Sequence, residues 1–321
     1  VKNTGREETV SLQENLQEND PLQEEMQIET EKEEKEEKED SPESAAKEQT
    51  AVSEEELDLE DDIENGYFHF LRPSDGLIAA FFVPVAVLII LFAQRGIFPF
   101  GEECFLRTDM YHQYAPFFSE FQYKLKQGGS LLYSWDIGMG VNFSALYAYY
   151  LASPVNWLII LCPKKFIIEF MTILIMVKTG LCGVTFTWYL DHHFEKKHFV
   201  AGVFGIFYAL SGYMAAYSWN IMWLDCILLF PLIVYGLERL VREQKGMLYC
   251  VTLGLSILSN YYISIMTCLF LVLYFIALLI LEEPGPVRKY VESCVRFGIY
   301  SLLSGGLAAG VLLPEICALQ S

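Results

Sequence analysis

Asp109 is the residue of this sequence best placed to act as a base. It lies between Arg107 and Gln113, shortly after a long apolar run at residues 76–93. A carboxylate beside hydrogen-bonding side chains can accept a proton from a substrate hydroxyl, which is the role of a general base. An acidic residue before an aromatic-patterned helix is also a common helix cap. The local sequence favours the cap and leaves catalysis as the alternative.

Lys178 is informative because it lies near the middle of the apolar run 166–190. An ionisable group there costs at least ~2.5 kcal/mol on insertion scales, so a partner should compensate for it. Intramembrane charges are usually functional, which favours a cavity where Lys178 meets a phosphate or a carboxylate. The alternatives are a structural ion pair and a shifted span whose ammonium reaches the interface. Asp225, just inside a later apolar run, can face Lys178 or a ligand.

No metal or cofactor site is expected. His192, His193 and His198 occur in one Lys-containing segment, but their spacing matches no ligand pattern. Residues 138–140 (GMG) are too short for a phosphate-binding loop and are typical of a tight turn. No Ser/His/Asp or Cys/His constellation stands out, so the charged residues above remain the candidates.

The composition divides the chain into two parts. The 321 residues carry a formal net charge of −19, yet 53% of them are hydrophobic. Residues 1–65 hold 25 of the 41 acidic and 6 of the 22 basic residues, so the whole net charge lies there. They contain too little apolar surface to fold, which predicts a disordered acidic tail. A solvated tail is favoured over a docking segment for a partner.

Residues 66–321 are neutral overall, and long apolar runs separate their charges. This pattern excludes an ordinary soluble enzyme and predicts an all-α polytopic membrane domain with about seven transmembrane helices. We expect membrane lipid, and no nucleic acid, among its partners. The predicted spans are residues 76–93, 166–190, 199–217, 221–237, 247–258, 262–281 and 291–313.

Basic residues predict the orientation of these spans. If the tail is cytoplasmic, each loop that returns to the cytoplasm is basic, and only Lys164 and Lys165 fit less well. The N-terminus is therefore expected in the cytoplasm, and residues 95–163 form a large extracytoplasmic loop. The return loops contain Lys196, Lys197, Arg239, Arg242, Lys245, Arg288 and Lys289.

The 95–163 loop has a pattern of its own. Aromatic and apolar residues at helical spacing predict an amphipathic helix at residues 107–125 that lies on the membrane surface. Residues 133–140 then turn the chain. Residues 147–163 are apolar but interrupted by Pro154, which predicts a half-inserted segment instead of a span.

A family resemblance follows from a series of short motifs. Asp109 and Gln113 are followed by residues 133–135 (YSW), 138–140 (GMG) and 149–154 (YYLASP). Later motifs are 211–213 (SGY), Asp225 before 229–232 (LFPL), 259–262 (SNYY) and 313–314 (LP). In this order they resemble the bacterial YfhO membrane-protein family, over about residues 70–321. Members of that family are usually much longer, so we expect a C-terminally truncated member. The acidic tail is not part of the resemblance.

The resemblance implies a GT-C-like glycosyltransferase in a bacterial cell membrane. Such an enzyme moves a sugar from a polyprenyl-phosphate donor to an extracytoplasmic cell-envelope polymer such as teichoic acid. By motif position Asp109 becomes the catalytic base, which reverses the local preference for a cap. Gln113 then helps shape the acceptor site, Lys178 is a candidate contact for the donor phosphate, and Arg107 and Asp225 are further candidate substrate contacts. No cofactor is implied.

Two other functions fit the sequence. In a transporter or lipid flippase, Lys178 and Asp225 line the substrate path. In a non-catalytic scaffold for envelope assembly, the tail recruits partners. If the protein is the enzyme, we expect Asp109, Lys178 and Asp225 to converge on one outward-open cavity. Positions of these residues on separate surfaces would count against the enzyme.

Overall fold

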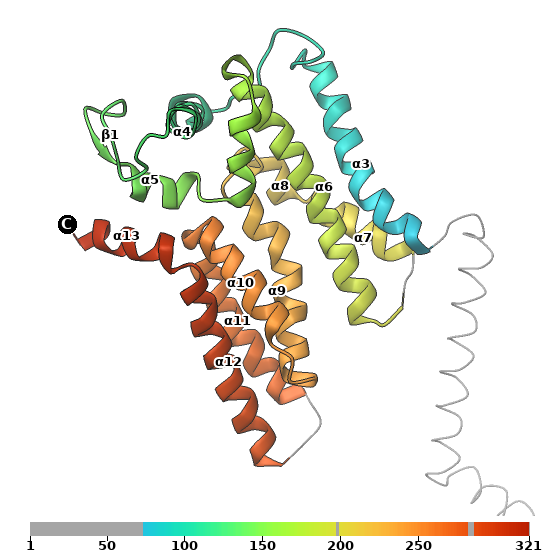
Figure 1. The fold of residues 1–321 in the computed structure, drawn as a ribbon. Helices are drawn as coiled ribbons and strands as arrows, with labels where there is room; N and C mark the ends of the chain where they lie inside the picture. The colour runs from blue at the N-terminus through green and yellow to red at the C-terminus, as the bar shows by residue number, and fades with distance from the viewer. Residues whose placement is uncertain (1–72, 197–198, 282–285, 321) are drawn as a thin grey trace, which may run out of the picture. The chain divides into compact units, whose positions relative to one another are not determined.

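The computed structural model describes residues 73–196, 199–281 and 286–320, so the predicted acidic tail lies outside the described residues. The described part is almost entirely helical (Figure 1). Its first elements are α3 (Pro73–Gln94), η1 (Met110–Tyr114), α4 (Ala115–Gln127), β1 (Tyr133–Ser134), β2 (Val141–Asn142), α5 (Phe143–Tyr150), η2 (Pro154–Leu161) and η3 (Lys164–Phe166). They are followed by α6 (Ile167–His193), α7 (Phe199–Ala209), α8 (Gly212–Tyr217), α9 (Leu224–Arg242), α10 (Met247–Ser259), α11 (Tyr261–Leu281), α12 (Val287–Leu307) and α13 (Ala309–Gln320).

The helices confirm an all-α polytopic membrane protein. Four of the described segments are long and apolar enough to cross a membrane, and up to six are if two bent pairs each count as one span. Two predicted spans fall outside that count. The first, α9, carries four charged residues, and the second, α10, has only 13 residues. The four segments are Ser74–Gln94, Lys164–His193, Phe199–Tyr217 and Tyr261–Leu281.

Two of the predicted apolar segments are broken. The segment containing Pro154 bends by 107° between α5 and η2, which matches the predicted interruption. The predicted span 291–313 bends by 75° between α12 and α13, so it is a span only if the bent pair counts as one. Gly305 and Gly306 immediately precede the bend at Ala308. Paired glycines are a known cause of kinks because they weaken the helix.

Close helix packing joins α3, α6 and α7, which lie side by side (Figure 1). A Cβ atom at Gly183 of α6 would collide with the carbonyl oxygen of Ala80 in α3. One at Gly205 of α7 would lie 2.6 Å from the carbonyl oxygen of Gly183. Small residues let helix backbones approach closely inside membranes, where packing replaces the hydrophobic effect as the main attraction. The glycines therefore set the spacing of these three helices.

A second group consists of α9, α10, α11 and α12, and α9 also packs against α6. Buried residues from three of these helices form its core, including Ile233 and Leu237 of α9, Tyr249 of α10 and Phe275 of α11. A separate core joins the 95–163 loop to α6 and to the turn before α9. The loop is thus packed onto the helices through residues such as Phe121.

The helix predicted at residues 107–125 is present as η1 and α4, but its buried face differs at the start. Phe118 and Phe121 are buried as expected, whereas Tyr111 is 65% exposed and Met110 is buried in its place. The cause is the π-helical turn of η1. A π turn is wider than an α turn, so it shifts the register of the face that follows it.

Candidate active site

Asp109 begins the helical part of the 95–163 loop, and the fold does not use its carboxylate. The residue precedes η1 with φ −67° and ψ −20°, and its side chain makes no capping hydrogen bond. It is exposed. A capping carboxylate accepts a backbone N–H of the first turn, so the cap interpretation loses its main support. The carboxylate is therefore accessible from outside the protein.

Two tyrosines lie within electrostatic range of Asp109. The Tyr114 hydroxyl donates to Oδ1 of Asn220 at 2.8 Å, and the Tyr150 hydroxyl donates to Oε1 of Gln113 at 3.1 Å. Burial raises the pKa of Tyr114 above its ordinary value, and the negative charge of Asp109 raises it further. Tyr114 therefore stays protonated at neutral pH and acts as a donor. Asp109 is the group of this cluster that can accept a proton.

A cavity of about 770 Å³ borders the same segment of the loop. Arg107 lines it, together with residues of α3, α6 and α8. Asp109, Lys178 and Asp225 are not among its lining residues. The three charged candidates thus do not converge on this cavity. Thr179 lines the cavity instead of its neighbour Lys178, because successive helical residues point about 100° apart.

Lys178 and Asp225 form a buried ion pair. Lys178 Nζ lies 2.6 Å from Oδ2 of Asp225 and donates to the carbonyl of Ile221 at 3.3 Å. Ser153 Oγ donates to the other carboxylate oxygen at 3.0 Å. The charged side chains are 3% and 9% exposed. Asp225 also lies in the first turn of α9, where the helix dipole favours a negative charge. Contact of Lys178 or Asp225 with a substrate stays a prediction.

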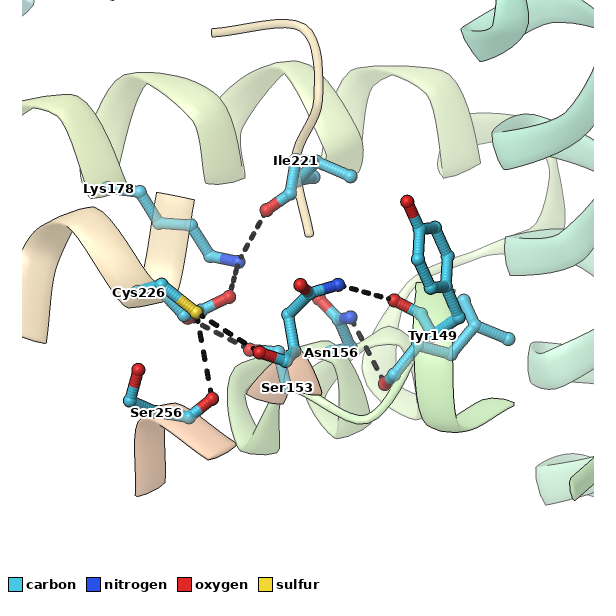
Figure 2. A network of polar contacts seen from close by, with 10 residues as sticks. Tyr149, Ser153, Asn156, Lys178, Ile221, Cys226 and Ser256 are labelled. Carbon is cyan, nitrogen blue, oxygen red and sulfur yellow. Dashed lines mark hydrogen bonds and ion pairs between the residues drawn. The ribbon is translucent and has the colours of Figure 1, made fainter. Parts of the chain in front are cut away.

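The ion pair belongs to a polar network that involves three interruptions of the helices, and Figure 2 shows Lys178, Ile221 and Ser153 of this network. The break between α5 and η2 supplies Ser153, and the turn before α9 supplies the carbonyl of Ile221. The break between α10 and α11 supplies Asn260, whose Nδ2 donates to the carbonyl of Tyr149 at 3.0 Å. The carbonyl of Asn260 lies 3.6 Å from Sγ of Cys226. Broken helices free backbone groups that need partners in an apolar bundle, and this network provides them.

Sequence reasoning missed three members of these networks, Ser153, Asn220 and Asn260. Each adjoins an interruption that the sequence does indicate: Ser153 precedes Pro154, and Asn260 lies between the predicted spans 247–258 and 262–281. Asn220 lies in the turn before α9. A hydroxyl or amide side chain at a helix break of an apolar chain is the signal that could have identified them, because freed backbone groups need such partners.

Glu238 organises a second polar cluster at the C-terminal end of α6. Its side chain is 1% exposed and accepts hydrogen bonds from Tyr189 at 3.0 Å and Tyr274 at 2.7 Å. Its Oε2 lies 2.6 Å from Nδ1 of His193 and 3.8 Å from Arg242. Protein groups therefore satisfy this carboxylate, and the cluster ties together α6, α9 and α11. The described residues contain no group of three or more His, Cys, Asp or Glu side chains arranged to hold a metal ion.

Comparison with known proteins gives one consistent result. The family model described as bacterial membrane protein YfhO matches residues 79–321. An uncharacterized protein YfhO of Bacillus subtilis (strain 168) is 23% identical over 211 residues, which cover 59% of this chain and 24% of that protein. The chain thus spans about a quarter of the length of that relative. No solved structure matches the chain.

Proposed function

This chain belongs to the YfhO family of bacterial membrane proteins, and we propose that it is a membrane glycosyltransferase. The reaction moves a sugar from a polyprenyl-phosphate donor to a cell-envelope polymer such as teichoic acid, outside the membrane. The donor and acceptor classes come from the family resemblance. The observation that carries the proposal is the exposed carboxylate of Asp109, which makes no capping hydrogen bond.

In the proposed mechanism Asp109 takes the proton of the acceptor hydroxyl while that oxygen attacks the anomeric carbon of the donor sugar. The new glycosidic bond forms as the bond from that carbon to the phosphate oxygen breaks, and polyprenyl phosphate leaves. Gln113 is held by the hydroxyl of Tyr150 and contributes to the acceptor site. The phenol of Tyr114 stays protonated, so it does not compete with Asp109 for the proton.

The ion pair has a positioning role in this proposal. Tyr114 joins η1 to Asn220, and the next residue, Ile221, accepts from Lys178 through its carbonyl. A continuous chain of contacts therefore connects the segment that carries Asp109 to the middle of α6. Because both charges of the buried pair are already compensated, a role in holding this frame suits Lys178 better than contact with a donor phosphate.

The proposed orientation keeps the N-terminus in the cytoplasm. The basic ends of α6 and α9 lie together, since His193 at the end of α6 contacts Glu238 near the end of α9. The first half of α12 joins them, because Arg296 donates to the carbonyl of Gln244 at 3.3 Å. Basic residues gathered at one end of a membrane bundle favour that end as the cytoplasmic one. Asp109, in the loop at the other end of α6, is then outside.

One observation favours a transporter as the second candidate function. Two helix breaks contact the pair of Lys178 and Asp225, and a third joins the same network through Asn260 and Tyr149. Broken helices that meet inside a bundle are typical of substrate sites in transporters. A flippase would use these breaks to move a lipid-linked sugar without forming a new glycosidic bond.

Reconstitution separates the two functions. The full-length protein is placed in proteoliposomes with radiolabelled polyprenyl-phosphate glucose or polyprenyl-phosphate N-acetylglucosamine, and with a poly(glycerol phosphate) acceptor. A glycosyltransferase produces labelled polymer. Movement of the labelled donor across the bilayer with no labelled polymer would establish the transporter in its place.

A further inference from the structure

The 770 Å³ cavity has the walls of a site for a hydrocarbon chain. Five of its lining residues lie on one face of α3 and just beyond it, at positions 87, 88, 91, 92 and 95. This spacing gives an almost unbroken apolar wall that runs about 12 Å away from Arg95, at about 1.5 Å per residue. Leu210 and Met214 form part of the facing wall. The volume lies within the range of sites that bury small ligands, roughly 300–1,000 Å³.

The wall on α3 also reaches the surface of the bundle. Leu91 lines the cavity and is 47% exposed, and Ile90 beside it is exposed as well. Because α3 is one of the spans long and apolar enough to cross the bilayer, exposed apolar side chains on it face lipid. A lipid chain can therefore enter the cavity sideways from the bilayer.

Two arginines stand at the loop side of this apolar wall. Arg95 and Arg107 both line the cavity and are exposed. Neither guanidinium has a hydrogen-bond or ion-pair partner within 73–196, 199–281 and 286–320. Glu103 is the acidic residue among the lining residues, so positive charge is in excess. The planar guanidinium fork matches phosphate oxygens in two-point hydrogen bonds, which makes a pair of free arginines a site for that group.

Thr179 gives an independent sign of a ligand. It lines the cavity from α6 and is 2% exposed, yet its hydroxyl has no hydrogen-bond partner in the described structure. A buried hydroxyl without a partner costs about 1–3 kcal/mol, so such groups normally meet a polar atom. A polar atom of a bound molecule would satisfy it.

We propose that this cavity binds an isoprenoid lipid phosphate, with the phosphate held by Arg95 and Arg107 and the hydrocarbon chain along α3. Recognition of the phosphate and the chain follows from the cavity alone. Identification of the lipid as an isoprenoid and as the sugar donor rests on the proposed function. The location suits that role, because residues 107 and 109 lie at most about 7 Å apart along the chain. A sugar on the bound phosphate is then within reach of Asp109.

Binding is tested on the full-length protein in phosphatidylcholine nanodiscs, with geranylgeranyl phosphate as the probe and geranylgeraniol as its uncharged match. We expect the phosphate to bind at least about tenfold more tightly than the alcohol, since charge-assisted hydrogen bonds to phosphate are lost with the alcohol. Equal affinities for the two probes would overturn the phosphate site. Phosphatidylglycerol is added as a competitor, and equal competition by it would overturn the assignment to an isoprenoid lipid.

Variants of the cavity charges give opposite expected results. Arg95→Gln and Arg107→Gln each weaken binding of geranylgeranyl phosphate about tenfold, while Glu103→Gln strengthens it by removing a repulsive charge. Arg288→Gln is the matched control, because Arg288 is exposed and pairs with Glu292 at the start of α12. Wild-type affinity in both cavity arginine variants would refute the proposal.

The variant Asp109→Asn distinguishes the lipid site from the proposed reaction. It should bind geranylgeranyl phosphate as the wild type does, because Asp109 does not line the cavity. If the wild type binds geranylgeranyl phosphate tightly through the arginines but transfers no sugar, the proposed glycosyltransferase function is refuted. The proposed lipid site would then still stand. If the arginine variants still transfer sugar with unchanged donor affinity, the proposed lipid site is refuted. The proposed glycosyltransferase function would then still stand.

Discussion

Removal of one member of the buried ion pair should destabilise the protein strongly. In Lys178→Met, the described residues leave Asp225 the hydroxyl of Ser153 and the dipole of α9 to compensate a carboxylate that is 9% exposed. The carbonyl of Ile221 also loses its donor. A buried charge left without its partner costs about 3–5 kcal/mol. We expect a loss of that size in the free energy of unfolding of Lys178→Met, and a similar loss in Asp225→Leu.

The double variant Lys178→Met/Asp225→Leu removes both charges together. Replacement of a whole buried pair by apolar residues is often neutral or stabilising, because two desolvation costs disappear with the attraction. The double variant should therefore lose much less unfolding free energy than the sum of the losses in the two single variants. The comparison of single and double variants isolates the coupling between these neighbouring residues.

The measurement is reversible unfolding of the full-length protein from detergent micelles by sodium dodecyl sulfate, followed by tryptophan fluorescence. Losses below about 1 kcal/mol in both single variants would match a solvated surface pair. That result, or losses that simply add in the double variant, would refute the account of a buried pair that joins the α5–η2 break to the turn before α9.

Three further predictions address other parts of the structure. Tyr114→Phe leaves the buried amide oxygen of Asn220 without its donor and should lower the unfolding free energy by about 1–3 kcal/mol in the same assay. An unchanged unfolding free energy would contradict a stabilising role of the hydrogen bond from Tyr114 to Asn220. Gly183→Val forces side-chain atoms into a backbone carbonyl of α3 and should lower the unfolding free energy by about 1–3 kcal/mol or more. Gly298→Ala should have a small effect, because a Cβ there meets nothing within 4 Å. Equal effects of the two variants would exclude close packing as the cause. Deletion of residues 1–65 should leave donor turnover in proteoliposomes unchanged, and loss of turnover would connect the tail to catalysis.

Hydropathy was sufficient to predict the all-α membrane class, because a bilayer admits few other spanning structures. Local geometry was harder to foresee. Gly305 and Gly306 are a local sign of the bend at Ala308, but they do not show that α13 would pack against α5. The burial of Met110 in place of Tyr111 depends on a π turn, which a search for α-helical spacing cannot detect.

For the candidate site, the cost of burying Lys178 predicted that a partner exists, and Asp225 was one of the candidates. The choice between a ligand and an ion pair needed three-dimensional packing, since the two residues are far apart in sequence. Ser153 was missed because a hydroxyl has no charge to draw attention to it. The cavity between α3, α6 and α8 also lies beyond sequence reasoning, because its lining residues come from segments far apart in the sequence.

The most direct test of the proposed enzyme is the initial rate of sugar transfer by Asp109→Asn in proteoliposomes. Asp136→Asn serves as the matched control, because Asp136 is an exposed aspartate of the same loop. Loss of a general base typically lowers the rate by about 10²-fold to 10⁴-fold. We predict a fall of that size in Asp109→Asn and a wild-type rate in Asp136→Asn. A wild-type rate in Asp109→Asn would contradict the assignment of Asp109 as the catalytic base.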